Sequence, residues 1–145
     1  MKGIRMQGGI PLQGKVRIQG SKNAALPILA ATLLTNEVSY IQNCPRIADV
    51  HRFVHLLREL GCLVHWQEKG IRVQPGENEE LPCERAEARR MQGEAITGMR
   101  SSLCLLGALL GRCGYVTMEH PGGCVIGERP IDLHIRALQL SLIHI

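Results

Sequence analysis

The sequence of 145 residues predicts an α/β fold made of repeated β-α-β-α units with buried helices, and the series of units is incomplete. One observation is that residues 24–34 are apolar almost all round, which is typical of a helix buried in a core. A second is that this pattern recurs, because residues 23–34 align without gaps on residues 100–111. A third is that a strand pattern and a second helix start follow both copies. Each unit is therefore expected to be a buried helix, a strand and another helix.

The individual elements follow from local patterns of apolar and polar residues. Ser21 or Asn23 can cap the first helix, and Gly61 is a suitable stop for the second. Residues 75–94 are rich in acids and arginines, which indicates a charged surface connection. The expected strands are residues 4–6, 16–19, 38–42, 62–66, 71–74 and 115–118. The expected helices are residues 24–34, 49–60 and 101–110, followed by one that begins at Pro130.

Composition argues against two classes of function. Aromatic residues make up only 3% of the chain, and the formal net charge is +4, with lysine and arginine scattered along the sequence. A nucleic-acid-binding protein normally has a basic patch or a set of stacking aromatic residues, and neither is visible. The longest apolar runs fall well short of the roughly 20 residues needed to cross a bilayer. We therefore expect no nucleic-acid partner and no membrane span.

The six cysteines do not have the spacing of a metal site. None forms a Cys-x-x-Cys pair or a paired ligand spacing with histidine, so we expect no metal. Cys62 and Cys104 lie in apolar patterns and are expected in the core. The first twenty residues contain no apolar run of the kind found in signal peptides. The simplest interpretation is a cytoplasmic protein whose thiols are reduced.

One cysteine differs from the other five in its surroundings. Cys124 lies among three glycines in residues 121–127, and glycine allows the backbone to turn tightly around the thiol. Arg129 follows at the expected start of a helix, where free N–H groups favour anions. A thiol beside such an arginine suits a site for a phosphorylated substrate, although a glycine-rich turn with a small structural cysteine is the alternative. Lys22 also stands at a helix start, where a lysine is usually only solvated.

Residues 121–127 (Pro-Gly-Gly-Cys-Val-Ile-Gly) and 129–134 (Arg-Pro-Ile-Asp-Leu-His) closely resemble the active-site loop of one enzyme family. This is the UDP-N-acetylglucosamine enolpyruvyl transferase, or 1-carboxyvinyltransferase, family. The resemblance covers the chain as far as about Leu138, which corresponds to the first part of a family member.

The resemblance implies a domain organisation. The fold would be an inverse α/β barrel-like domain, of which this chain contains only a part. Residues 1–20 would form strands that belong to the family's second domain. Residues 21–138 would form the first two of three repeats in the first domain, and residues 139–145 would be an atypical, truncated tail.

The resemblance also implies a reaction: transfer of the enolpyruvyl group of phosphoenolpyruvate to the 3-hydroxyl of UDP-N-acetylglucosamine, without a metal or organic cofactor. This is the first committed step of peptidoglycan synthesis, and so of cell-wall biogenesis, cell shape, cell cycle and cell division. Cys124 would be the general acid and the target of fosfomycin. The residues implied to bind phosphoenolpyruvate are Lys22 and Asn23. Those implied to bind UDP-N-acetylglucosamine are Arg100, Arg129, Pro130, Ile131, Asp132 and Leu133.

Two alternatives stay open at this point. The shikimate-pathway enolpyruvyl transferase has a similar fold and a Ser-Lys-x-Asn-like helix start, but it lacks the Pro-Gly-Gly-Cys loop of residues 121–127. The other alternative is a non-catalytic module that binds nucleotide sugars. Because a third repeat and a second domain are missing, we expect the chain to be inactive by itself. Its uncovered apolar helices are then expected to favour self-association.

Overall fold

The computed structural model describes residues 3–74, 76, 90–91, 96, 98–118 and 130–140. Helices and strands are mixed along this part of the chain, so the α/β prediction is confirmed at that level. In chain order, with η for 3-10 helices, the elements are α1 (Lys22–Ala31), η1 (Thr32–Leu34), β1 (Ser39–Gln42), α2 (Ala48–Glu59), β2 (Leu63–Gln67), β3 (Gly70–Gln74), β4 (Arg90–Met91), η3 (Arg100–Ser102), α4 (Leu103–Cys113), β5 (Thr117–Met118) and α5 (Asp132–Leu140).

Three of the strands form an antiparallel sheet with β3 in its centre, in the order β1-β3-β2. The strands expected at residues 62–66 and 71–74 are confirmed as β2 and β3, which form a hairpin: they are joined at residues 68–69, and Gln67 pairs with Gly70. Val64, Ile71 and Val73 are buried, because apolar side chains at alternate positions cover one face of a strand. Strands β4 and β5 form a separate parallel pair.

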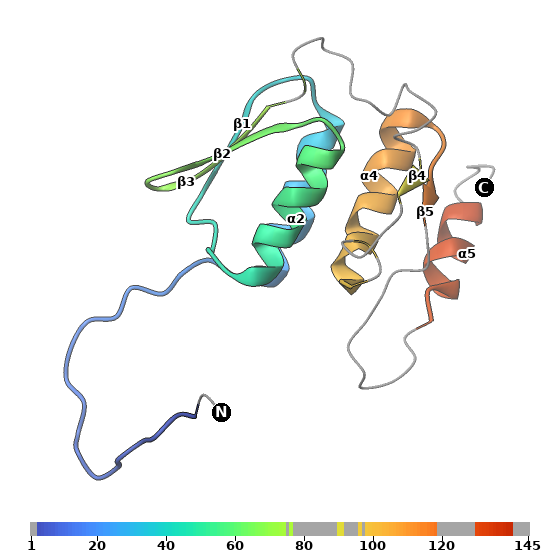
Figure 1. The fold of residues 1–145 in the computed structure, drawn as a ribbon. Coiled ribbons are helices and arrows are strands. Elements are labelled where there is room, and N and C mark those ends of the chain that lie inside the picture. The colour runs from blue at the N-terminus through green and yellow to red at the C-terminus, as the bar shows by residue number, and fades with distance from the viewer. Residues whose placement is uncertain are drawn as a thin grey trace.

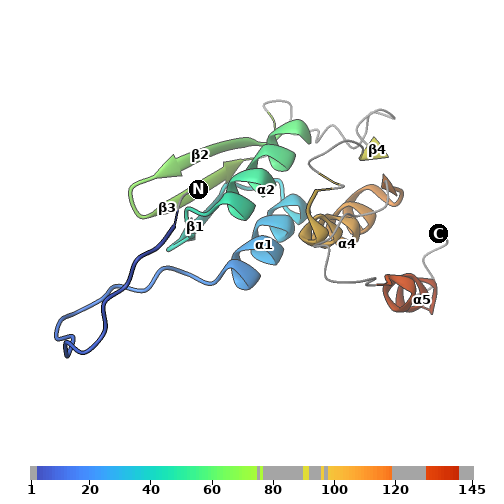
Figure 2. The same ribbon diagram turned by 60° about the horizontal axis from the view of Figure 1, so that its bottom comes forward.

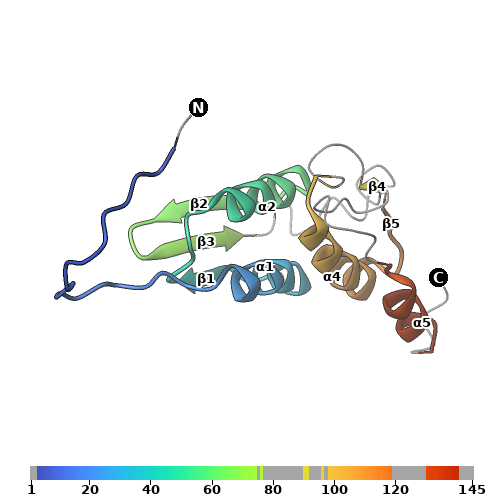
Figure 3. The ribbon, with the colours of Figure 1, turned by 90° about the horizontal axis from the view of Figure 1, so that it is seen from below.

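The core lies between this sheet and the helices. Helices α1 and α2 run side by side across one face of the sheet (Figure 3). Leu29 of α1, Phe53 of α2 and Leu105 of α4 are completely buried. Each large apolar side chain that is buried in this way contributes roughly 1.5–3 kcal/mol. Helix α4 packs against α1 (Figure 2), and Arg112 near its end donates a hydrogen bond to the carbonyl of Leu33 at 3.1 Å.

In the part of the chain that the structure describes, helices α1, α2, α4 and α5 point in roughly the same direction. The N-terminal ends of α2, α4 and α5 lie toward the bottom of Figure 1 and their C-terminal ends toward the top. Helix α1 runs beside α2 in the same direction (Figure 3). Strand β1 follows α1 and η1 before α2 begins, and β5 follows α4 in the same way before α5 begins. The starts of these described helices therefore lie at one end of the described structure. Helix α5 is the outermost of the four, and none of its residues is buried.

The sequence predicts strands at residues 4–6 and 16–19, but this chain alone forms none there. Residues 3–20 contain no strand, and the segment runs away from the body of the molecule (Figure 1). Its apolar side chains are exposed, with Ile4 at 91% and Leu12 at 96%. An alternating apolar pattern forms a strand only beside another strand, since its backbone groups need partners. The segment joins the body where the N–H of Gly20 donates to the carbonyl of Asn43.

The helix at residues 24–34 is confirmed, but it is not buried all round. It begins at Lys22, and Leu26 and Leu29 are buried on one face while Ile28 is 49% exposed on the other. Ser21 occupies the N-cap position, although its side chain makes no cap hydrogen bond. The last turn tightens into η1, where the Thr32 hydroxyl donates to the carbonyl of Leu29 at 2.7 Å. One apolar face of α1 is therefore uncovered.

Two other helix predictions are corrected at their ends. Helix α2 spans Ala48–Glu59, and Gly61 adopts a positive φ of 86°, as its predicted role as a stop requires. In the second unit, η3 and α4 together extend the predicted helix at both ends. Helix α5 begins at Asp132 rather than at Pro130, because its first backbone hydrogen bond runs from Ile135 to Ile131.

Replacing Gly70 by alanine should destabilise the fold, whereas replacing Gly107 by alanine should stabilise it. A methyl group at Gly70 would overlap the carbonyl oxygen of Ile41 and lie 2.9 Å from Cα of Gln42 in the paired strand. At Gly107 in α4 nothing lies within 4 Å, and alanine is the better helix former by about 1 kcal/mol. Denaturant unfolding should show a loss of about 1–3 kcal/mol for Gly70→Ala and a gain for Gly107→Ala. A gain in stability for Gly70→Ala and a loss for Gly107→Ala would contradict the packing described around these two glycines.

Candidate functional site

The candidate site lies at the end of the molecule where the helices begin. Lys22 is the first residue of α1, Asp49 lies in the first turn of α2, and Arg100 is the first residue of η3, directly before α4. Free N–H groups and the helix dipole give each helix start a partial positive charge. Parallel helices add these charges at one end of the fold (Figure 1). Such an end attracts anions.

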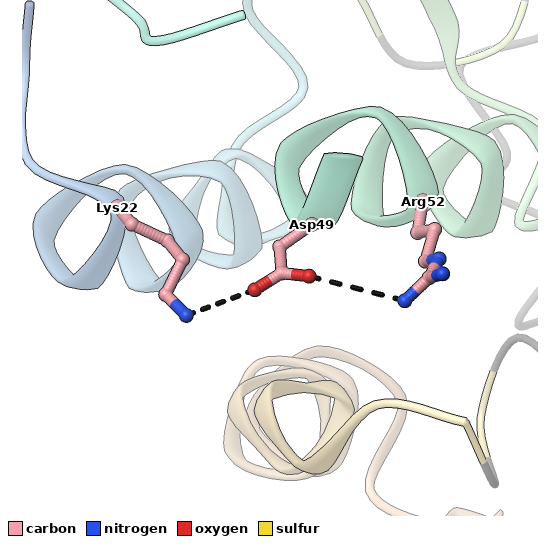
Figure 4. A network of polar contacts seen from close by, with 3 residues as sticks. All are labelled: Lys22, Asp49 and Arg52. Carbon is pink, nitrogen blue, oxygen red and sulfur yellow. Dashed lines mark hydrogen bonds and ion pairs between the residues drawn. The ribbon is translucent and has the colours of Figure 1, made fainter. Parts of the chain in front are cut away.

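Two of the helix starts are joined by an ion pair. The ammonium Nζ of Lys22 lies 2.9 Å from Oδ2 of Asp49 and donates a hydrogen bond to it. The other carboxylate oxygen, Oδ1, lies 3.9 Å from Nη1 of Arg52, one turn further along α2. Figure 4 shows Lys22 and Arg52 reaching Asp49 from opposite sides. The side chain of Lys22 is 47% exposed and that of Asp49 32%, so a ligand in solution can reach the pair.

Core packing explains why residues 27 positions apart in sequence meet here. Leu26 and Leu29 of α1 are buried in the same core as Val50 and Phe53 of α2. These residues lie within about two turns of each helix start, so their packing holds the two helix starts beside each other. The ion pair is thus a consequence of the apolar contact between α1 and α2 rather than its cause.

Arg100 follows a turn that a buried serine stabilises. The Ser102 side chain is completely buried, and its hydroxyl lies 2.7 Å from the carbonyl of Met99 and 3.2 Å from that of Ile96. These contacts satisfy the hydroxyl and hold the chain just before α4, so they help to position Arg100, which is half-buried. Sequence reasoning missed this role. The available signal was the alignment of Ser102 with Ala25, because both units carry a small residue at this position. Both residues are buried in the structure.

The predicted site residues are only partly described. Asn23 is exposed in the first turn of α1. At the start of α5, Pro130, Asp132 and Leu133 are exposed, and Ile131 is half-buried.

Cys124 and Arg129 lie outside the described residues. The roles that the resemblance implies for Cys124 and Arg129 therefore stay predictions. Sequence reasoning also missed that Asp49 is the partner of Lys22. The available signal was the alignment of Asp49 with Asp132 at the starts of the two second helices.

The described thiols are poor candidates for a reactive cysteine. Cys44, Cys62 and Cys104 are free, and burial raises the pKa of each. For Cys62 burial raises the pKa to about 11, against a smaller lowering by the charge of Arg112. The expected core position of Cys62 is confirmed, whereas Cys104 is only partly buried. Cys113 is disulfide-bonded, so the expectation that all thiols are reduced is wrong for this residue.

Neither a metal site nor a membrane-spanning helix is present among the described residues. In the part of the chain that the structure describes, no group of three or more His, Cys, Asp or Glu side chains is arranged to hold a metal ion. Among the same residues, no helix is both long and apolar enough to cross a membrane. The features that remain are parallel helices with basic residues at two of their starts. They define an α/β protein with several helix starts at one end, where the helix dipoles favour negative charge.

Comparison with known proteins gives the family. Residues 6–145 match the EPSP synthase (3-phosphoshikimate 1-carboxyvinyltransferase) family, and the chain belongs to this family. It is 42% identical over 139 residues to the UDP-N-acetylglucosamine 1-carboxyvinyltransferase of Methylacidiphilum infernorum (isolate V4). Enzymes of the same name from Oleidesulfovibrio alaskensis and Coprothermobacter proteolyticus are 41% and 44% identical over 140 residues. These alignments cover 96–97% of this chain but only 31% of each relative.

Burial of Cys62 predicts a loss of stability at high pH. The unfolded thiol ionises near its ordinary value of 9, while the folded thiol stays neutral up to about pH 11. The stabilisation by the neutral buried thiol is complete below pH 9 and is lost as the pH rises to 11, by an amount on the order of 2 kcal/mol. Denaturant unfolding at pH 8, 9 and 10 should show a smaller decrease for Cys62→Ala than for the wild-type chain. If the free energy of unfolding fell equally with pH in both chains, the raised pKa of Cys62 would be contradicted.

Proposed function

We propose that this chain forms the first part of a UDP-N-acetylglucosamine 1-carboxyvinyltransferase. The observation that supports this most strongly is its 41–44% identity, over nearly its whole length, to relatives of that name. The reaction transfers the enolpyruvyl group of phosphoenolpyruvate to the 3-hydroxyl of UDP-N-acetylglucosamine and releases phosphate. It is the first committed step of peptidoglycan synthesis, and the proposal includes a cytoplasmic location. No metal or organic cofactor takes part.

The proposed mechanism is addition followed by elimination. Cys124 protonates C3 of phosphoenolpyruvate, and the sugar 3-oxygen forms a bond to C2 and loses its proton. In the second step C3 loses a proton and the bond from C2 to the phosphate oxygen breaks, which restores the double bond and frees phosphate. A positioned acid typically accelerates proton transfer by about 10²–10⁴-fold. Alignment of the two bound substrates supplies a further part of the rate.

The helix starts bind the anionic groups in this proposal. Lys22 and Asn23 bind phosphoenolpyruvate, with the partial positive charge of α1 adding to that of the ammonium group. The exposure of the Lys22–Asp49 pair at the anion-attracting end supports this role. The residues proposed to bind UDP-N-acetylglucosamine lie at the starts of α4 and α5 or just before α5. They are Arg100, Arg129, Pro130, Ile131, Asp132 and Leu133.

The family architecture accounts for the uncovered surfaces. Residues 21–138 are proposed to form two repeats of an inverse α/β barrel-like domain, a view supported by the shared order of helix, strand and helix in both units. Residues 1–20 would pair with strands of a second domain, in agreement with their exposed apolar side chains. By itself the chain is proposed to be inactive and to self-associate through the exposed face of α1, which includes Ile28.

A 3-phosphoshikimate 1-carboxyvinyltransferase is the second candidate, because the matching family carries that description. Two observations favour UDP-N-acetylglucosamine instead. The Pro-Gly-Gly-Cys sequence of residues 121–127 supplies a thiol where the shikimate-pathway enzyme lacks this loop. The relatives named above also carry the UDP-N-acetylglucosamine name.

Cys124 is expected to react with fosfomycin before any other cysteine of this chain. The reason is its glycine-rich loop and the nearby Arg129, whereas the Cys62 thiol is buried with a pKa of about 11. Peptide mapping after partial labelling measures how the fosfomycin label is distributed among the cysteines. Labelling centred on Cys44, Cys62 or Cys104 would count against Cys124 as the acid.

Lys22→Met should weaken the binding of phosphoenolpyruvate by the chain, whereas Lys15→Met should not. Loss of a charge-assisted contact costs about 1.5–3 kcal/mol, which raises the dissociation constant about tenfold or more. Lys15 provides the matched control because it is exposed on the segment before the first helix. Calorimetric titration measures both dissociation constants. Equal affinities of the two variants, or no binding by the wild-type chain, would contradict the proposed function.

A further inference from the structure

We propose that Asp49 is a positioning residue, which holds the ammonium group of Lys22 where the phosphate of phosphoenolpyruvate binds. This inference rests on the function proposed above and adds a residue to that site. Asp49 acts through Lys22 and does not touch the substrate. Three observations carry the inference: the geometry of the pair, the number of hydrogen-bond donors on the ammonium group, and the exposure of both side chains.

The carboxylate of Asp49 is fixed from two directions. One oxygen accepts a hydrogen bond from Lys22 at 2.9 Å, and the other lies 3.9 Å from the guanidinium of Arg52 (Figure 4). Arg52 lies three residues further along the same helix, so its contact needs only the helix itself. The contact with Lys22 bridges α1 and α2, and the buried interface between these helices determines where the carboxylate lies. The Asp49 carboxylate is therefore a hydrogen-bond acceptor in a fixed position, and it can restrict the flexible side chain of Lys22.

The pairing leaves Lys22 able to bind an anion. An ammonium group has three N–H donors, and Asp49 accepts one of them. Two donors are left for phosphate oxygens, and the side chain is 47% exposed. A lysine side chain that is not held adopts many rotamers, and ordering it during binding weakens affinity. With Asp49 present, that ordering occurs when the protein folds.

Asp49 also has an effect of the opposite sign, because its negative charge repels an anionic ligand. The three side chains together carry a net charge of +1, from two cations and one anion, so the site still attracts anions. High salt distinguishes the repulsion of the ligand by Asp49 from the positioning of Lys22 by Asp49. The electrostatic screening length falls from about 8 Å at 0.15 M salt to about 3 Å at 1 M salt. Repulsion between exposed groups is suppressed at 1 M salt, whereas the loss of a fixed lysine position is not.

The test compares four forms of this chain: wild type, Asp49→Asn, Asp49→Glu and the control Glu59→Gln. Asp49→Glu keeps the charge but moves the carboxylate by one methylene. Glu59 is an exposed acid near the other end of α2 that pairs with His55, so its replacement removes a similar surface ion pair. Nitrogen-15 relaxation of the lysine Nζ atoms measures how strongly Lys22 is held, with the exposed Lys69 as reference. Titration with phosphoenolpyruvate at 1 M salt gives the affinity, and amide spectra confirm that each variant is folded.

The expected results differ for each variant. Lys22 should be more ordered than Lys69 in the wild-type chain and in Glu59→Gln, and similar to Lys69 in Asp49→Asn. At 1 M salt Asp49→Asn should bind phosphoenolpyruvate about 3- to 10-fold more weakly than wild type. Asp49→Glu should have an intermediate affinity, and Glu59→Gln should differ from wild type by less than about twofold.

Two results would overturn the inference, and they are distinguishable. If the wild-type chain binds phosphoenolpyruvate and Asp49→Asn binds it equally or more tightly at 1 M salt, Asp49 does not position Lys22 for this ligand, and the proposed function stands. If the wild-type chain does not bind phosphoenolpyruvate at all, the proposed function fails and this inference fails with it.

Discussion

The apolar contact between α1 and α2 is the constraint on which the rest of the described structure depends. Leu29 and Phe53 are completely buried in the core that joins the two helices, and the sheet covers the same core from one side. Removal of either side chain would leave a cavity that costs about 2–5 kcal/mol, a large part of the stability of a small domain. Because the helices run in the same direction, this contact also brings Lys22 beside Asp49. Packing and the geometry of the site therefore have one origin.

Because the helices are parallel, the two ends of the fold differ in their electrostatic charge. Antiparallel neighbours would bring a positive helix start beside a negative helix end, and the two partial charges would largely cancel. Here the starts of α2, α4 and α5 lie at one end (Figure 1), and α1 begins beside α2 (Figure 3), so their partial charges add. Basic side chains at two of the starts, Lys22 and Arg100, strengthen the same sign. An acid in such a place, as Asp49 is, orders a cation without reversing the net positive charge of the site.

Local patterns allowed much of the fold to be predicted from the sequence. The spacing of Val50, Phe53, Val54 and Leu57 gives α2 one apolar face, and all four are buried. The hairpin was also predictable, since its alternation and its turn lie within a dozen residues. Residues 4–6 and 16–19 carry a similar alternation and form no strand, because a strand also needs a neighbour that the pattern itself cannot specify. The full burial expected for residues 24–34 failed for a related reason, since burial requires covering elements on both faces.

The candidate site was less predictable than the fold. Lys22 could be singled out because it stands at a helix start, but its pairing with Asp49 depends on two helices meeting in space. The role of Ser102 is equally non-local, because its hydroxyl contacts carbonyls before its own helix. The assignment of Cys124 came from resemblance to a known loop and from the glycines around it. That residue and Arg129 lie outside the described residues, so their roles are proposals.

The central claim is that this chain supplies the first part of a UDP-N-acetylglucosamine 1-carboxyvinyltransferase. The chain spans 31% of the length of the Methylacidiphilum relative, so a chimera tests the claim most directly. In it, the 139 aligned residues of the relative are replaced by those of this chain. The measurement is phosphate release from phosphoenolpyruvate with either UDP-N-acetylglucosamine or 3-phosphoshikimate as acceptor. The account predicts release with UDP-N-acetylglucosamine and its loss in Cys124→Ala. A folded chimera that releases no phosphate with this acceptor, or that uses 3-phosphoshikimate instead, would contradict it.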